Sequence, residues 1–253
     1  MTTTSIATST ATGITIRGKS LVDDLLGKLT FTEMIVFQML GRVPSPGEAA
    51  CIDACLVALI EHGLTPSAIA ARLVYTSAPE AMQGAVAAGL LGVGGRFVGT
   101  VEGCAALVAR IAGAPDALSE AAAIVAEAKG PIPGFGHDVH KPDDPRTPRL
   151  FAIARQHGLA GKHVAALELL GATLDGAKRR HITINATGAV AAILADAGVP
   201  AEIMRGFALI ARCAGLVGHV HEEQHAPAMG AIWRAAEHAV PYIPPQESEG
   251  EPP

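Results

Sequence analysis

Residues 131–146 read PIPGFGHDVHKPDDPR, and this polar segment interrupts a chain that otherwise has the pattern of apolar helix. Gly134 and Gly136 allow backbone conformations that other residues avoid, and they let main-chain N–H groups approach a ligand. His137 follows directly, so we expect its imidazole to be presented by a constrained turn. The alternative is a plain surface loop in which glycine and proline make the turns and His137 is solvated.

The end of this segment predicts a helix start. Asp144 is expected as the N-cap, Pro145 as the first helical residue and Arg146 in the first turn, although Thr147-Pro148 fits a start equally well. Helix N-termini attract anions, and an arginine there can hold a carboxylate through two parallel hydrogen bonds. A histidine close to such a clamp indicates acid–base chemistry on an organic acid.

Composition limits the class of protein. The chain has 253 residues, of which 49% are apolar, so it can bury a sizeable core. Its net charge is −5, and we expect its Lys and Arg residues to be scattered rather than clustered, so we expect no nucleic-acid partner. Glycine and charged residues break the apolar runs well before the roughly 20 residues of a membrane span, so we expect no membrane partner. The N-terminus lacks a basic region followed by an apolar stretch, and we expect a cytoplasmic protein.

Cysteine and histidine spacing gives little support for a metal. Cys51, Cys55, Cys104 and Cys213 form no Cys-x-x-Cys pair, and we expect them as small buried apolar groups. Two histidine pairs invite a metal site, His221 with His225 on one helical face and His137 with His140. The sequence places no obvious third ligand with either pair, so we expect no metal.

Helix starts recur along the chain. Thr30-x-x-Glu33 and Ser45-Pro46-Gly47-Glu48 predict capping boxes, Ser77-Ala78-Pro79-Glu80 repeats the pattern, and Thr65-Pro66 has it without the glutamate. Period-two alternation is confined to residues 14–17, so we expect an all-α fold with roughly ten to twelve helices and at most one short hairpin. With only six Phe, two Tyr and one Trp, the helices must pack closely through Ala and Gly.

The segment at residues 131–146 resembles the histidine loop of the citrate synthase superfamily, in which Pro-Gly-x-Gly-His is followed a few residues on by Asp-Pro-Arg. Four further segments are similar to that family in the right order. They are residues 16–44, with an Arg-Gly turn and a Gly-x-x-Pro loop; residues 94–99, GGRFVG, similar to the C-terminal module of ATP-citrate lyase; residues 184–189, INATGA; and residues 208–219, ALIARCAGLVGH. The likeness covers about 200 residues and is closest to the lyases.

The resemblance implies an all-α, citrate synthase-like fold with a large and a small lobe. Residues 13–99 and 206–242 would form the large lobe. Residues 100–205 would form a small lobe that carries the catalytic loop and closes over substrate. Residues 1–12 and 243–253 are expected as disordered tails because of their composition.

The resemblance also implies a site for an acyl-coenzyme A. His137 would exchange a proton with the hydroxyl or carbonyl oxygen of a citryl unit, and Arg146 and Arg212 would clamp carboxylates. The backbone of Pro133, Gly134, Phe135 and Gly136 would lie against the adenine of coenzyme A. The remaining expected substrate-binding residues are Phe97, Asn185, His219 and Arg234, the last donated across the interface of a homodimer or larger homo-oligomer.

Two departures from the family pattern shape the predicted reaction. Phe97 stands where citrate synthases have a histidine, which favours the lyase branch. Thr187 stands where the family has the carboxylate that moves the α-proton, and the nearest carboxylates in sequence are Asp175 and Asp196. We therefore predict a carbon–carbon lyase that cleaves a citryl-CoA-like 3-hydroxyacyl-CoA to acetyl-CoA and an oxo compound, with His137 and Thr187 as catalytic residues.

In this reaction His137 takes the hydroxyl proton, and a water held by Thr187 protonates the carbon. The main alternative is a catalytically degenerate protein or subunit that binds CoA esters. An unrelated CoA-dependent reaction, such as thioester hydrolysis, is a third.

Overall fold

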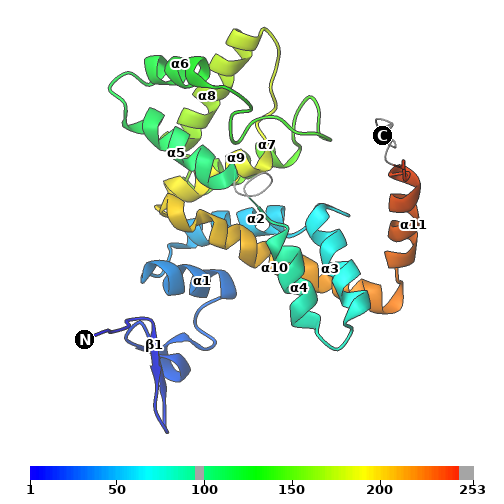
Figure 1. The fold of residues 1–253 in the computed structure, drawn as a ribbon. Coiled ribbons are helices and arrows are strands. Elements are labelled where there is room, and N and C mark those ends of the chain that lie inside the picture. The colour runs from blue at the N-terminus through cyan, green and yellow to red at the C-terminus, as the bar shows by residue number, and fades with distance from the viewer. Residues whose placement is uncertain (95–99, 245–253) are drawn as a thin grey trace, which may run out of the picture. The chain divides into compact units, whose positions relative to one another are not determined.

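The computed structural model describes residues 1–94 and 100–244 (Figure 1). It divides into two compact units, Met1–Glu61 with Val93–Arg212 and His62–Gly92 with Cys213–Pro253. The boundaries of these units differ from those of the predicted lobes. Residues 13–61 fall with residues 100–205, because α2 (Pro46–Ile60) packs against α7 (Arg146–Gln156) and α9 (Ala186–Asp196).

Helices dominate both units, as the sequence predicts. Besides α2, α7 and α9, the first unit contains α1 (Phe31–Leu40), α5 (Thr100–Gly113), α6 (Ala117–Glu127), α8 (Lys162–Lys178), a short π-helix at Leu21–Leu25 and a 3-10 turn at Ala201–Ile203. The second unit contains α3 (Pro66–Ser77), α4 (Met82–Leu91) and α11 (Met229–Ala239). α10 (Met204–His225) begins in the first unit and ends in the second.

The N-terminal strands correct two expectations. β1 (Ala7–Ser9), β2 (Ile14–Ile16) and β3 (Lys19–Ser20) form an antiparallel sheet in that order, with Thr8 opposite Thr15. We had expected residues 1–12 to be disordered and at most one hairpin. The threonines suit an extended strand, and Thr10 closes the first turn by accepting a bond from the Gly13 N–H at 3.1 Å. Of the expected C-terminal tail, residues 245–253 lie outside the described residues.

The capping boxes are confirmed at α1 and α2. Thr30 and Glu33 exchange the two bonds of the motif at 3.2 and 2.7 Å, and Ser45 and Glu48 do so at 3.3 and 2.7 Å. The start predicted at Ser77 is wrong: Ser77 is the last residue of α3, and its hydroxyl donates back to the Leu73 carbonyl. A short polar side chain can make either bond, so the pattern alone does not separate a helix start from a helix end.

Small residues set the core of the first unit, where α5, α6, α8 and α9 lie together (Figure 1). In α9 every residue from Gly188 to Leu194 is buried. A close approach brings Gly188 to the loop at residues 131–146, where an added Cβ would lie 2.6 Å from the Gly134 carbonyl oxygen. The predicted packing through Ala and Gly is therefore what positions the loop against α9.

The second unit has its own small core. It is built from the buried residues Ala68, Ala71, Ala85, Val86, Leu216 and Val220. Gly89 of α4 allows the close packing, since an added Cβ would lie 2.7 Å from Leu216.

One stretch, Ala201–His225, is long and apolar enough by length and composition to cross a membrane. A core helix of a globular protein passes the same test. Met204, Phe207 and Ala208 are buried in the core of the first unit, which explains the apolar composition of this stretch.

Candidate active site

The glycine-rich loop is held by the segment that leads into α9. Gly134 and Gly136 both have positive φ, +89° and +79°, as the sequence predicts for this turn. The Asn185 N–H donates to the Gly134 carbonyl at 3.0 Å, and the Asn185 side-chain amide donates to the Gly136 carbonyl at 2.9 Å. The Gly136 N–H donates to the Thr183 carbonyl at 2.7 Å. The loop is therefore a fixed part of the fold rather than a solvated surface turn.

The His137 ring has a defined hydrogen-bonding role. Its Nδ1 accepts the backbone N–H groups of Val139 and His140 at 3.1 and 3.0 Å, and the His140 ring lies 4.4 Å from it, centroid to centroid. Because Nδ1 is an acceptor, the neutral ring carries its proton on Nε2. In this tautomer Nε2 is the donor atom of the ring.

A cavity of about 680 Å³ lies next to this loop. Phe135, Gly136 and His137 form part of its wall. The wall also contains several basic side chains, Lys129, Lys141, Lys178, Arg180 and His181. A cavity of this size with apolar surface and a basic wall suits an organic ligand that bears phosphates.

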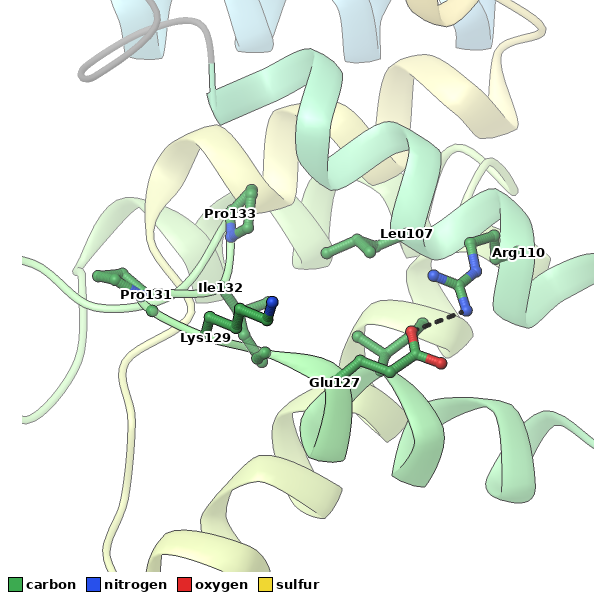
Figure 2. Close-up of a pocket in the computed structure, with 10 residues that line it drawn as sticks. Leu107, Arg110, Glu127, Lys129, Pro131, Ile132 and Pro133 are labelled. Atoms are coloured by element: carbon green, nitrogen blue, oxygen red, sulfur yellow. Dashed lines mark ion pairs between the residues drawn. The ribbon is translucent and has the colours of Figure 1, made fainter.

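A smaller cavity of about 220 Å³ (Figure 2) shares residues 128–132 with the wall of the larger one. Its floor is apolar, with Leu107 and Ile124. Arg110 on its rim is paired with Glu120 at 2.6 Å and with Glu127 at 3.5 Å. Its arginine is therefore already neutralised, and the larger cavity is the better candidate for an anionic ligand.

Arg146 is held by its neighbour Asp144. Its Nε and Nη2 donate to the two carboxylate oxygens of Asp144 at 3.0 and 2.8 Å, and its Nη1 donates to the Ala58 carbonyl at 3.4 Å. These bonds use three of the five guanidinium N–H groups. α7 begins at Arg146, one residue later than predicted, and Asp144 still accepts the Arg146 backbone N–H as a cap would.

Asp144 joins the starts of α7 and α9. The side chain is fully buried, and it also accepts the Ala186 backbone N–H at 2.9 Å. Burial alone would raise the pKa of this carboxyl, but the hydrogen bonds from Arg146 outweigh it and hold the pKa at about 2. Asp144 is therefore ionised at neutral pH and serves as an anchor rather than as a base.

Arg212 is the least satisfied cation among the described residues. It is 7% exposed, and its Nε and Nη1 are buried and make no hydrogen bond to the described part of the chain. Its nearest carboxylate is that of Glu61, 3.9 Å from Nη1. Burial lowers the pKa of Arg212, Arg146 lowers it further, and Glu61 opposes the shift. Buried donors without acceptors are costly, so this side chain is poised to bind an anion.

Arg146 and Arg212 meet at the end of α2. Arg146 contacts Ala58 and Arg212 faces Glu61, and these positions lie about one helical turn apart. The two guanidinium groups that we expected to clamp carboxylates therefore lie on one side of the same helix end.

Thr187, in the first turn of α9, belongs to a chain of hydroxyl groups. Its hydroxyl donates to Asn185 Oδ1 at 2.7 Å and lies 2.9 Å from the hydroxyl of Thr100. Because a hydroxyl has one proton, Thr100 must be the donor in the second bond. Asn185 Oδ1 also accepts the Gly188 N–H and caps the helix, so Asn185 fixes both the loop and α9.

Asp175 and Asp196, the nearest carboxylates in sequence, do not replace the missing base. Asp196 accepts the backbone N–H groups of Gly161, His163 and Val164 at the start of α8. Asp175 bonds His181 and the Ile182 N–H. Both have structural partners.

Residues 3–236 match the family model described as "Citrate synthase, C-terminal domain". This chain belongs to the citrate synthase family. A citryl-CoA lyase from Hydrogenobacter thermophilus is similar to it, with 33% identity and a TM-score of 0.88, over 98% of this chain and 97% of that one. The ATP citrate lyase of Methanosaeta concilii in complex with (3S)-citryl-CoA has 21% identity and a TM-score of 0.79, over 98% of this chain and 42% of that one. The latter likeness shows the fold.

A relative from Mycobacterium tuberculosis (strain ATCC 25618 / H37Rv), named "Putative citrate synthase 2", is 30% identical over 191 residues. The match covers 72% of this chain and 49% of the relative, so the chain spans about half the length of the curated relatives it matches.

The remaining residues that the citrate synthase family pattern suggested lie outside the described part of the first unit. Phe97 lies outside the described residues. His219 and Arg234 belong to the second unit. There His219 Nδ1 accepts a bond from Arg72 Nε at 3.0 Å, and Arg72 also pairs with buried Glu223 at 2.7 Å. Arg234 lies on the exposed α11.

Several residues of the site in this citrate synthase family member escaped the sequence analysis. Glu61 and Thr100 gave no signal, because their importance depends on which helices meet. The basic wall had a visible signal, the run Lys178-Arg179-Arg180 directly before the segment that leads into α9. The expectation that basic residues are scattered is therefore wrong at this point.

Proposed function

We propose that this member of the citrate synthase family cleaves a citryl-CoA-like 3-hydroxyacyl-CoA to acetyl-CoA and an oxo compound. The observation that carries the proposal is Arg212, a buried guanidinium with two unsatisfied nitrogens beside Arg146. A substrate carboxylate would supply the missing acceptors. The two N–H groups of Arg146 that its bonds to Asp144 and Ala58 leave over would serve a second carboxylate.

The cavity supports coenzyme A as the carrier. The backbone of residues 133–136 is proposed to lie against the adenine. Of these residues Phe135 and Gly136 line the cavity, and Lys129, Lys178 and Arg180 on its wall would bind the phosphates. His137 belongs to the same wall, which brings the reacting end of a thioester within range of an imidazole.

The reaction moves one proton from oxygen to carbon. Removing the substrate hydroxyl proton lets the bond between the carbinol carbon and the α-carbon break, giving an oxo group and the enolate of acetyl-CoA. Protonation of the enolate carbon completes the cleavage. The two products together contain all the atoms of the substrate, so no water is consumed and no redox partner is needed. His137 is the group proposed for the first step.

The hydrogen bonds of His137 place a condition on that step. To accept a proton at Nε2 the neutral ring must carry its own proton on Nδ1, and that tautomer cannot keep the bonds from Val139 and His140. Substrate binding must therefore break these two bonds, either by turning the imidazole or by shifting the backbone of residues 138–140. This requirement corrects the simpler expectation that the imidazole is ready to act as a base.

The second step lacks a carboxylate at position 187. Thr187 directs its proton to Asn185 and accepts one from Thr100, so its remaining lone pair can hold a water. Such a water would protonate the enolate carbon and regain a proton from solvent, while His137 gives up the proton that it took, so the two steps balance. The rate would be below that of an enzyme with a carboxylate there.

The direct test is release of acetyl-CoA from (3S)-citryl-CoA by the full chain and by His137→Ala and Arg212→Met. The proposal expects release by the wild type that either substitution reduces at least about 100-fold, since each removes a catalytic or charge-bonding group. Absence of release, or equal release by all three proteins, would overturn it.

The replacement at Thr187 also favours a second candidate, a non-catalytic protein or subunit that binds CoA esters. Such a binder would raise its melting temperature with acetyl-CoA and citryl-CoA and would show no turnover. The two candidates therefore differ in turnover and agree in binding.

We also propose a cytoplasmic homodimer in which Arg234 enters the partner's site. The four cysteines are free, which supports a reducing compartment. Trp233 on α11 is 59% exposed, which supports an interface there. Mixing inactive His137→Ala and Arg234→Ala proteins should restore up to about a quarter of wild-type activity, since half of the random dimers hold one intact site. No restoration, or a monomer by light scattering, would refute the shared site.

A further inference from the structure

The His181 imidazole connects two segments that border the large cavity. Its Nδ1 lies 2.7 Å from an oxygen of Asp175 on α8, and its Nε2 lies 2.9 Å from an oxygen of Asp143 in the loop before α7. Carboxylates accept and do not donate, so both ring nitrogens must be donors. The ring that makes both bonds is the imidazolium form.

This bridge fastens the loop that carries His137. Thr183 lies two residues after His181. Its carbonyl accepts the Gly136 N–H, and its hydroxyl donates to the Pro142 carbonyl. The loop is thus bound at residue 136, at residue 142 and, through His181, at Asp143. His137, Pro142 and His181 all line the cavity.

The charges around the ring favour the bridge. Asp143 and Asp175 face it directly, while the cations Lys141, Lys178 and Arg180 share the cavity wall with it. The side-chain bond to Asp175 is the largest influence, followed by that to Asp143, and together they raise the pKa of His181 above 6.5. The ring is 47% exposed, so it exchanges protons with solvent.

Loss of one proton breaks the bridge on one side. One ring nitrogen then presents a lone pair to a carboxylate, which repels it. Asp175 is also anchored by the Ile182 N–H at 2.7 Å, whereas the Asp143 side chain is 66% exposed. The bond to Asp143 is therefore the one that opens, and the loop between His137 and α7 loses one of its three attachments.

We propose that His181 is a positioning residue that fastens the His137 loop over the coenzyme cavity, and that its deprotonation loosens this loop and weakens binding of CoA esters. The inference rests on the proposed function only for the identity of the ligand. Opening of the His181–Asp143 bond would also let the loop move, which is one of the two ways to allow the change of tautomer at His137.

The test compares binding of acetyl-CoA to the full chain by calorimetry from pH 6.5 to 9.5. Wild type should lose affinity roughly three- to tenfold across one ionisation, the size expected for one exposed charged contact. His181→Gln should bind weakly with no such step, and His181→Arg, which keeps its charge, should bind tightly throughout. His157→Gln, a histidine outside the cavity wall, is the matched control and should follow wild type.

Hydrogen exchange of the amides in residues 138–143 gives a readout that needs no ligand. The protection factors of these amides, which remove the base-catalysed rise of intrinsic exchange with pH, should fall in the wild type over the same pH range, and in His181→Gln they should be low at every pH. A step in affinity that persists in His181→Gln, or protection factors independent of pH in the wild type, overturns the inference. If acetyl-CoA does not bind at any pH, the proposed function fails and the exchange profile still decides the role of His181.

Discussion

Replacing Arg212 with methionine should stabilise the ligand-free protein and abolish most of its activity. The guanidinium is buried, two of its nitrogens lack acceptors among the described residues, and Glu61 at 3.9 Å gives only a weak pairing. Each unsatisfied buried donor costs about 1–3 kcal/mol, whereas the lost pairing with half-exposed Glu61 is worth at most about 1 kcal/mol. Methionine fills similar space without the charge.

Two such donors cost about 2–6 kcal/mol, so after loss of the pairing the expected gain in the free energy of unfolding is about 1–5 kcal/mol, or roughly 2–20 °C in melting temperature for a chain of this length. Activity should move in the opposite direction. Two charge-assisted bonds to a substrate carboxylate are worth about 3–6 kcal/mol, so kcat/KM for citryl-CoA should fall about 10²- to 10⁴-fold.

Calorimetric melting and initial rates of acetyl-CoA release on the same preparations give both numbers. Arg155→Met is the matched control, since Arg155 is half-exposed and pairs with Glu168 at the surface, and it should change neither number appreciably. A less stable Arg212→Met protein, or one with undiminished kcat/KM, would refute the view that Arg212 is held unsatisfied for a ligand.

Three other substitutions follow from the same contacts. Thr187→Asp should raise the rate of cleavage about 10²- to 10⁴-fold, whereas Thr187→Asn should not, because only the carboxylate supplies a base; equal rates for both would contradict this. The pKa of Asp144 is lowered to about 2 in the folded protein, so its ionised carboxylate contributes about 2 kcal/mol of stability above about pH 4, and this is lost as the pH falls towards about 2. In urea unfolding, Asp144→Asn should therefore have a lower free energy of unfolding than the wild type at pH 7, and that free energy should depend less on pH in acid. Gly188→Ala should cost about 1–3 kcal/mol, because its Cβ would lie 2.6 Å from the Gly134 carbonyl oxygen, while Gly176→Ala, where no atom lies within 4 Å, should be neutral or stabilising.

The local rules of helix capping and turn chemistry made much of the fold predictable. The capping boxes at Thr30 and Ser45, the positive φ at Gly134 and Gly136, and the helix start next to Asp144 all depend on neighbours in sequence. The threonine-rich N-terminus was misjudged because low apolar content resembles disorder, although strand pairing with residues 14–16 orders it.

The candidate site was less predictable, because its properties arise from tertiary packing. Sequence and family likeness named Arg146 and Arg212, but the bidentate bond of Arg146 to Asp144 and the unsatisfied burial of Arg212 depend on where α2, α7 and α10 meet. The tautomer of His137 likewise depends on the backbone of Val139 and His140. His181 stood next to a basic run in the sequence, and only the fold brings Asp143 to it.

A structure of the full chain with (3S)-citryl-CoA bound tests the central claim most directly. We expect a substrate carboxylate within about 3 Å of Nε or Nη1 of Arg212, the hydroxyl within hydrogen-bond reach of His137 Nε2, and the adenine in the cavity bordered by residues 135–137. A carboxylate bound elsewhere, with Arg212 still lacking an acceptor, would contradict the account.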